Sequence, residues 1–445
     1  MTALFGAGSR LATDIKIAYR SLTRHVRRSI FLGGAIAGVT ALLILLTGLS
    51  TGVREAMEYS ATTLSSGHVN IGGFFKVTAG QSAPVVTNYE KVLETIKPTV
   101  PELDFAVMRG RGWAKVISES GSMQAGINGV DIRNEPEFKK VLSIVSGNID
   151  DLAQPGTVLV FEDQLKKLDV KVGDAITISA QTTRGVANTI DCRVVAIARD
   201  VGLMSKWNIY VPIETLRGLY QLNANATGAI HLLLKDQYKE QAPQIAARLR
   251  TTLEKANYRV MDADPRAFWM KFETVNREEW TGQKLDVTTW EDELSFLTWV
   301  LQMLNGMTFV LLVILIAIVV TGIMNTMWIA IRERTREIGT LRAIGMYRFG
   351  VLRMFLLESL MLGFFGAVAG ALAGAALGSG LNALKLKVPE AAQLFLMSER
   401  VHLAVHGSQV VSAVILLTVV TALAAFYPSF RAARLRPIEA MSHFG

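Results

Sequence analysis

The chain has 445 residues, of which 50% are hydrophobic and only 19% are charged, and its formal net charge is +8. Charged residues make up about a quarter of an ordinary soluble domain, so this composition argues against that class. The single cysteine, Cys192, excludes an intrachain disulfide.

Four runs without a charged residue are each long enough to cross a bilayer core, which needs about 20 apolar residues. They cover residues 30–50, 294–331, 359–384 and 407–430. The second run would form a helix about 57 Å long at ~1.5 Å per residue. Because this length is nearly twice the bilayer core, we expect its first part, which contains Trp299, to project outside the membrane.

Lysine and arginine are concentrated in three segments beside these runs. Residues 1–29, 332–353 and 431–445 together carry a net charge of +11, whereas the whole chain carries +8. By the positive-inside rule, these segments and both termini face the cytoplasm, and residues 51–293 lie outside. The basic excess is therefore explained by membrane topology and does not indicate nucleic-acid binding.

The N-terminal segment also has a helical apolar stripe flanked by basic residues. The stripe consists of Leu11, Ile15, Ala18, Leu22 and Val26. This pattern predicts an amphipathic helix on the lipid surface; a solvated basic tail is the alternative.

The predicted fold is an α-helical membrane protein with four transmembrane helices and a large mixed α/β extracytoplasmic domain. Its predicted parts in chain order are a cytoplasmic amphipathic helix (1–29), the first span (30–50), the external domain (51–293), the second span with an external extension (294–331), a cytoplasmic loop (332–353), the third span (354–384), an external loop (385–406), the fourth span (407–430) and a cytoplasmic tail (431–445). In the external domain, strands are predicted at 68–71, 113–117, 175–180, 190–197, 207–211 and 229–234, and helices at 90–96, 138–145, 213–219 and 240–253.

The third span contains small residues at regular spacing. They are Gly366, Gly370, Gly374 and Gly378. Glycines four residues apart line one helix face and let another helix approach closely, so they predict a helix-packing seam. Glu358 lies at the entry of this span, where an ionisable group is costly unless it is paired. Because the spans supply no further acid for a proton relay, we expect a structural role for it.

Signatures of catalysis are missing from the sequence. It has no G-x-x-x-x-G-K-[ST] phosphate loop and no His-Glu-x-x-His. His402 and His406 are four residues apart, but the sequence around them alternates like a strand and offers no third ligand. We therefore expect no catalytic residue, metal or cofactor in this chain.

Two motifs carry a family resemblance. Glu-Arg-Thr-Arg-Glu-Ile-Gly at residues 333–339, followed by Arg-Ala-Ile-Gly at 342–345, resembles the segment after the second span in permeases of the FtsX/MacB/Lol superfamily. The ending at 428–440 resembles that family's Pro-x-x-x-Ala-Ala-x-x-x-Pro-x-Glu-Ala pattern. The resemblance implies a MacB-like periplasmic core domain and an ABC system whose ATPase dimer, a separate polypeptide, binds ATP and magnesium.

The resemblance also implies a coupling helix that lies in a groove of the ATPase. Its polar contacts with the ATPase would be Arg334, Arg336, Glu337 and Arg342. Its buried apolar stripe would consist of Ile338, Leu341 and Ile344, which have helical spacing. Gly339 and Gly345 would allow a close approach or a turn. Closure of the ATPase dimer would then pull the second helix and move the outer domains, the mechanism called mechanotransmission. The alternative is an ordinary positive-inside loop.

Shorter motifs resemble the lipoprotein-releasing branch of the family. Val-Gly-Asp at 172–174 and Thr-Trp-Glu at 289–291 resemble motifs of these permeases. The resemblance implies an inner-membrane protein that extracts or releases lipoproteins. It also implies a second permease subunit, either identical or different. In the subunit that recruits the periplasmic carrier, a long hook follows the Val-Gly-Asp strand. Here only residues 181–190 are available, which argues against direct recruitment of the carrier through a hook. A periplasmic carrier or adaptor stays open as a partner. Efflux of amphiphilic substrates and regulation of a cell-wall hydrolase are the alternatives.

If the substrate is an amphiphile, the outer halves of the first two spans would form a lateral cavity for its acyl chains. The lining would be Ile36, Val39, Leu43 and Leu46 on one side and Met303, Leu304, Met307 and Phe309 on the other. The same residue types also occur on ordinary lipid-facing and helix-packing surfaces.

Overall fold

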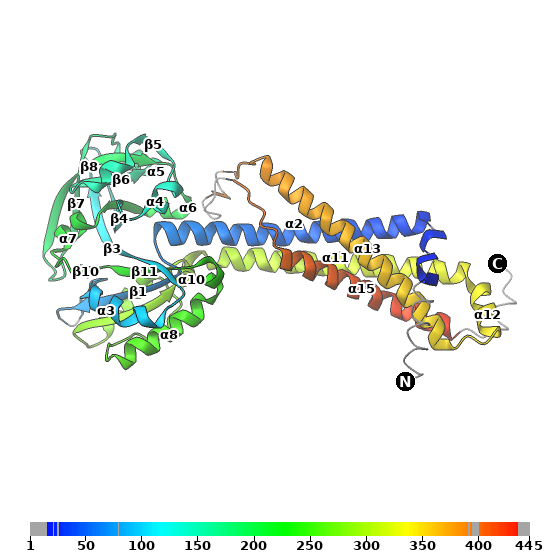
Figure 1. Ribbon diagram of the computed structural model, residues 1–445. Coiled ribbons are helices and arrows are strands. Elements are labelled where there is room, and N and C mark those ends of the chain that lie inside the picture. The colour runs from blue at the N-terminus through cyan, green and yellow to red at the C-terminus, as the bar shows by residue number, and fades with distance from the viewer. Residues whose placement is uncertain are drawn as a thin grey trace. The chain divides into compact units, whose positions relative to one another are not determined.

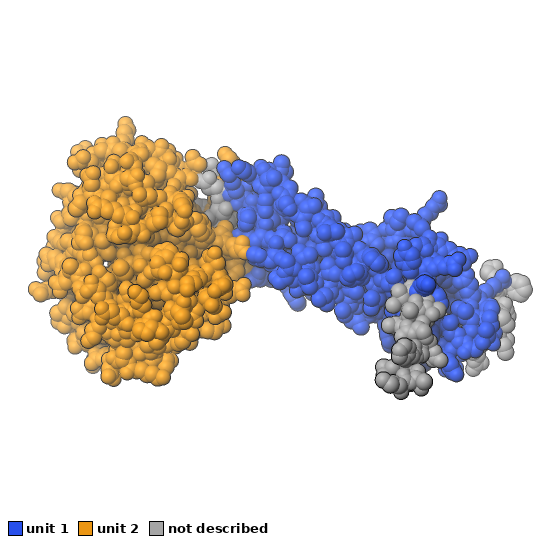
Figure 2. Space-filling model, in the orientation of Figure 1, with its two compact units in different colours: residues 1–53, 302–386, 400–445 blue, residues 54–301, 387–399 orange. Residues whose placement is uncertain are grey.

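The computed structural model describes residues 16–20, 22–24, 26–78, 80–389, 392–393 and 400–434 (Figure 1). The chain divides into two compact units, coloured separately in Figure 2. Unit 1 comprises residues 1–53, 302–386 and 400–445, and unit 2 comprises residues 54–301 and 387–399. Much of the predicted surface helix, including Leu11 and Ile15, lies outside the described residues, as does the predicted tail from residue 435 onward.

Unit 1 is built from the apolar helices. Helices α2 (Val26–Leu64), α11 (Thr298–Glu333), α13 (Arg348–Ala383) and α15 (Gly407–Ala433) are long and apolar enough to cross a membrane, and the short α12 (Thr335–Ala343) follows α11. Helix α2 has 39 residues and α11 has 36, so both exceed the about 20 residues that a bilayer core requires. The predicted four-helix membrane architecture is confirmed.

Helix α13 packs against α2 along its glycine face. A Cβ added at Gly370 would lie 2.6 Å from the Cα of Ala37, and one at Gly374 would lie 3.0 Å from the Cα of Ala41. A Cβ added at Gly366 would lie 3.0 Å from the carbonyl oxygen of Gly33. The small residues of both helices share a four-residue spacing, so the two backbones approach closely. A Cβ added at Gly378 would lie 3.3 Å from the side chain of Val405 and 3.8 Å from the side chain of Leu45 on α2, so no backbone atom of α2 comes as close there.

We predict that Gly370→Ala destabilises the bundle, because its Cβ would meet the α2 backbone and force the helices apart. Overpacking of this kind costs about 1–3 kcal/mol. Gly380→Ala is the matched control, since nothing lies within 4 Å of a Cβ at that position of the same helix. Thermal unfolding of the detergent-solubilised protein should show a lower midpoint for the first variant only. Equal midpoints would contradict the close approach.

Unit 2 is the mixed α/β domain. Its main sheet has the order β12-β1-β11-β3-β4-β9-β6-β8-β5, and β7 pairs with β3 and β8. The strands of this sheet are β1 (Val69–Lys76), β3 (Leu103–Ile117), β4 (Ser122–Val130), β5 (Ile144–Gly147), β6 (Thr157–Phe161), β7 (Ala175–Gln181), β8 (Ala187–Ala198), β9 (Asn208–Pro212), β11 (Ala229–Leu234) and β12 (Gly282–Thr289). A second, small sheet pairs β2 (Val86–Thr87) with β10 (Ala226–Thr227). Neighbouring strands are antiparallel except for the parallel pairs β4–β9 and β6–β8.

The helices of unit 2 are short. They are α3 (Tyr89–Ile96), α4 (Pro136–Val141), α5 (Glu162–Leu168), α6 (Gly202–Trp207), α7 (Ile213–Tyr220), α8 (Ala242–Lys255), α9 (Phe272–Arg277) and α10 (Trp290–Glu293), with 3-10 turns η1 (Lys97–Thr99), η2 (Ile149–Ala153), η3 (Asp236–Gln241), η4 (Phe268–Met270) and η5 (Ser295–Leu297). Helices α3 and α8 cover one core with β1, β11 and β12, and α5 and α7 contribute to another with β3, β4, β7 and β8. Strand β3 belongs to both halves of the sheet, because its residues 103–109 pair with β11 and its residues 110–117 with β4.

Most predicted elements of this domain are present, with one error. The helix predicted at 138–145 is wrong at its end, since α4 stops at Val141 and residues 144–147 form β5. Strands β4, β6 and β12 are additional to those expected from the sequence. Strands β7 and β8 form a tight hairpin with Gln181 opposite Ala187, so this fully described stretch contains no long hook.

Candidate coupling site

Helix α12 continues from α11 with almost no break. Arg334 lies between the two helices; its N–H donates to the Ala330 carbonyl, and its own carbonyl accepts from the Ile338 N–H. Hydrogen bonds of helical spacing thus cross the junction, so α12 is firmly attached to α11.

A glycine turn ends α12. Gly345 has a φ of 108°, its N–H donates to the Arg342 carbonyl, and the Met346 N–H donates to the Leu341 carbonyl. This is a Schellman motif, in which glycine takes the left-handed conformation that other residues rarely adopt.

The most buried charges near α12 form an ion cluster. The carboxylate of Glu358, on α13, accepts from Arg28 Nη2 of α2 at 3.0 Å and from Arg334 Nη1 at 3.1 Å. The Glu358 side chain is only 4% exposed. Glu333 lies at the edge, 3.8 Å from Arg28 and 55% exposed. Glu358 is thus a paired, structural carboxylate that joins α2, the α11–α12 junction and α13.

This cluster changes the role assigned to Arg334. The resemblance implied a polar contact with the ATPase, but Arg334 is buried and its guanidinium is bound to Glu358. Its expected role is therefore corrected from a docking contact to an internal anchor.

The residues of the apolar stripe expected on α12 differ in their exposure. Ile338 is 1% exposed and belongs to the core formed by α2, α11, α13 and α15, and Gly339 is buried beside it. Leu341 and Arg342 are partly buried, and Arg342 Nη1 donates to the Ala433 carbonyl at the end of α15. Ile344 is 80% exposed. Ile338 therefore packs within its own chain, and of the predicted stripe only Ile344 is well placed to meet a partner.

An exposed surface remains at the tip between α12 and α13. It consists of Arg336, Glu337, Ile344, Tyr347 and Phe349, which we call the tip surface. Tyr347 is 86% exposed and Phe349 is 69% exposed. Neither aromatic residue was expected from the sequence as a contact, although two aromatic side chains in a charged segment outside the apolar runs are a usable signal.

The second predicted site is not assembled as one open surface. Ile36 and Leu43 are buried in the core of the bundle, with Val39 and Leu46 partly buried. Met303, Met307 and Phe309 are exposed and Leu304 is partly buried. Helices α2 and α11 do meet near these residues, where Ser50 Oγ donates to Asn305 Oδ1 at 2.9 Å. The lining expected on α2 is thus corrected: Ile36 and Leu43 are packing residues in this structure.

We predict that Glu358→Gln destabilises the bundle and loosens α12, because it removes the buried negative charge that both Arg28 and Arg334 contact. Breaking a buried ion pair by removing one partner costs about 3–5 kcal/mol. Hydrogen exchange should become faster in the α12 amides, and the thermal midpoint should fall. Glu333→Gln is the control, since an exposed pair contributes about 0–1 kcal/mol. Unchanged exchange in Glu358→Gln would show that the cluster does not hold α12.

Family comparisons agree with this architecture. Residues 30–252, half of the chain, match the MacB-like periplasmic core domain, and residues 309–437 match the FtsX-like permease C-terminal domain. The chain therefore belongs to the FtsX/MacB/Lol permease superfamily.

Individual relatives cover the chain to different extents. It is 23% identical to the lipoprotein-releasing system transmembrane protein LolC of Neisseria meningitidis over 93% of both chains. It is 26% identical to the macrolide export ATP-binding/permease protein MacB of Bdellovibrio bacteriovorus, over 94% of this chain and 59% of that protein. The 40% identity to MacB of Nitrobacter winogradskyi extends over 27% of this chain and only 17% of that protein. The periplasmic region of MacB from Actinobacillus actinomycetemcomitans, a solved structure, aligns with 42% of this chain and 84% of its own at 12% identity and a TM-score of 0.28.

Proposed function

We propose that this chain is the membrane subunit of an ABC transporter and that a separate ATPase dimer docks on the tip surface. The observation that carries the proposal is the exposure of Ile344, Tyr347 and Phe349 beside Arg336 and Glu337. An apolar and aromatic centre with charged residues around it is typical of a protein interface. ATP hydrolysis would belong to the partner, and this chain would contribute no catalytic residue.

The contacts of α12 supply a path for force. A push on the tip surface would reach α11 through the hydrogen-bonded junction and α2 and α13 through the Glu358 cluster. It would reach α15 through the bond from Arg342 to Ala433. Because α12 is fixed at several points, it would move with the bundle, as mechanotransmission requires.

We predict that Ile344→Asp or Tyr347→Asp weakens ATPase binding by ~30-fold, corresponding to about 2 kcal/mol for an interface hot spot. Co-purification of the ATPase and its stimulated ATP hydrolysis should both fall. The control is Val186→Asp, because Val186 is 61% exposed on the β7–β8 hairpin of unit 2 and should not affect docking. Normal ATPase binding by the tip variants would refute the docking site.

The proposed location is the bacterial inner membrane with both termini in the cytoplasm. The basic residues of the flanking segments support this orientation. Helix α11 is the least buried of the four long apolar helices. Only 11% of the residues in its most apolar 18-residue segment are buried. Its exposed apolar side chains give a second permease subunit, identical or different, and membrane lipid a surface to contact.

For the substrate we propose an amphiphile, with lipoprotein release from the inner membrane as the first choice. The alignment with LolC over 93% of both chains supports this choice. The short β7–β8 hairpin supports a subunit that does not recruit a periplasmic carrier through a hook. MacB-like efflux and regulation of a cell-wall hydrolase are the alternatives.

We predict that a photocrosslinker at Met307, which is 53% exposed on α11, captures a lipid-modified protein in native membranes. A crosslinker at Leu43, which is 4% exposed, should report only intramolecular neighbours and serves as the control. Mass spectrometry of the adducts identifies the captured molecule. Capture of phospholipid alone, with normal lipoprotein sorting in a deletion strain, would favour the efflux or regulatory alternatives.

A further inference from the structure

Unit 2 contains a pocket of about 400 Å³ with an aromatic wall. The aromatic residues that line it are Trp113, Trp207, Phe268, Trp269 and Phe296. Trp113 is 41% exposed, Trp207 is 53% exposed and Trp269 is 40% exposed. Several half-exposed tryptophans around one concavity are typical of a ligand site, and the volume lies in the range of small-molecule pockets.

Strand β3 supplies the two arginines of the pocket. Side chains alternate along a strand, and Arg109, Arg111 and Trp113 line the pocket. The intervening glycines contact α7, where a Cβ at Gly110 would lie 2.8 Å from Leu216 Cδ2. Because the glycines have no side chain, α7 packs closely against one face of β3, and the long side chains lie on the opposite face of the strand.

Arg109 is fully engaged by the fold. Its Nε donates to Glu135 Oε2 at 3.0 Å, and its Nη2 donates to the Thr63 carbonyl at 2.6 Å. Its Nη1 donates to the Leu64 carbonyl. These carbonyls end helix α2, where a cation also stabilises the helix dipole. Arg109 is therefore a structural cap.

Arg111 is engaged only in part. Its guanidinium lies 4.1 Å from the centre of the Phe268 ring, and its Nη1 donates to Glu293 Oε1 at 3.4 Å. Its Nε and Nη2 are buried and have no hydrogen-bond partner among the residues that the structure describes. Donors buried without a partner are costly, and Nε with Nη2 is an edge of the guanidinium that can bind carboxylate or phosphate through two bonds.

The charges around Arg111 do not satisfy these donors. Glu293 also accepts from Thr288 Oγ1 at 2.8 Å. Asp286 Oδ2 accepts from Lys271 Nζ at 2.8 Å, and Asp286 Oδ1 has no hydrogen-bond partner among the described residues. Burial raises the pKa of the Asp286 carboxyl, which disfavours its charged form. Burial lowers the pKa of His231, so this nearby imidazole is neutral at pH 7.

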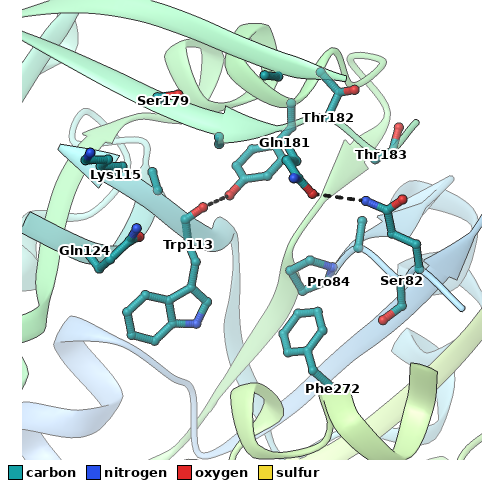
Figure 3. Close-up of a pocket in the computed structure, with 16 residues that line it drawn as sticks. Ser82, Pro84, Trp113, Lys115, Gln124, Ser179, Gln181, Thr182, Thr183 and Phe272 are labelled. Atoms are coloured by element: carbon teal, nitrogen blue, oxygen red, sulfur yellow. Dashed lines mark hydrogen bonds between the residues drawn. The ribbon is translucent and has the colours of Figure 1, made fainter. Parts of the chain in front are cut away.

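A second, more polar pocket of about 530 Å³ shares Trp113 (Figure 3). There the Tyr220 hydroxyl donates to the Trp113 carbonyl at 2.7 Å, and Gln181 accepts from Gln81 Nε2 at 3.3 Å. No side chain that lines this second pocket has a buried polar atom without a hydrogen-bond partner among the described residues, whereas the first pocket combines an aromatic wall with the unpartnered donors of Arg111.

We propose that the aromatic pocket binds an amphiphile whose apolar part lies among the tryptophans and whose carboxylate or phosphate pairs with Arg111. Arg109 holds one side of the pocket to the last turn of α2, and Glu293 and Phe296 lie just before α11. The bound ligand therefore contacts the segments that lead into two long helices. The proposal concerns unit 2 alone and does not depend on ATPase docking.

The test uses the full chain in nanodiscs and a diazirine derivative of octanoate, with labelled peptides identified by mass spectrometry. We expect saturable labelling of the segments around Trp113, Trp207 and Trp269. Octanoate and octyl phosphate should compete at least about tenfold better than octanol, because octanol lacks the anion. Better competition by octanoate would identify a carboxylate ligand, and better competition by octyl phosphate would identify a phosphate headgroup; either preference supports the proposal.

Two variants keep the test decisive. Trp207→Ala should reduce pocket labelling at least about fivefold, since it removes a large aromatic contact at a position that is 53% exposed. Trp299→Ala is the control, because Trp299 is 50% exposed and is not among the residues that line the pocket. Both variants should bind the ATPase as the unaltered chain does. Equal competition by octanol, labelling without saturation, or equal labelling of the two variants would overturn the proposal.

Discussion

The carboxylate of Glu358 is the group around which the α12 end of the bundle is organised. It is buried between Arg28 and Arg334, at 3.0 and 3.1 Å. Removing a charge from water costs several kcal/mol unless it is paired, so the buried Glu358 and Arg334 need each other, and the partly buried Arg28 adds a second counter-charge. Because they come from α2, the α11–α12 junction and α13, one ion cluster fixes three parts of the chain that are distant in sequence. The glycine seam between α13 and α2 extends the same contact along the helices by letting the backbones approach.

The orientation of α12 follows from this anchor. With Arg334 held, Ile338 enters the core and Arg342 reaches the Ala433 carbonyl. Ile344 and Tyr347 then extend from the opposite side, at 80% and 86% exposure. Burying a large apolar side chain is worth about 1.5–3 kcal/mol, and these residues do not realise that gain within their own chain. A partner that covers them would recover it, which is the physical reason to assign docking to the tip surface and not to the whole helix.

Local patterns in the sequence were sufficient for the spanning helices and the glycine seam, because both depend on near neighbours along one helix. They were insufficient for the coupling segment. Ile338, Leu341 and Ile344 have helical spacing, but α12 ends at Ala343 and the left-handed turn at Gly345 leaves Ile344 exposed, away from the core that holds Ile338. The role of Arg334 depends on Glu358 and Arg28, and Arg28 is 330 positions from Glu358. Strand β4 was missed for a local reason: Gly126, Asn128 and Gly129 have low strand propensity, and pairing with β3 and β9 overrides it.

The different roles of the two arginines in strand β3 could not be predicted from the sequence either. Residues 109–113 read Arg-Gly-Arg-Gly-Trp, and nothing in that alternation distinguishes the first arginine from the second. Both face the pocket because α7 lies against the glycines on the other face. Only the tertiary structure separates them: Arg109 is satisfied by Glu135 and the end of α2, whereas Arg111 keeps two donors unpartnered among the described residues. The fold gives each guanidinium nitrogen of Arg109 a hydrogen-bond acceptor and leaves two nitrogens of Arg111 without one. A buried group that the fold does not satisfy requires another explanation, and the aromatic wall beside it indicates a ligand.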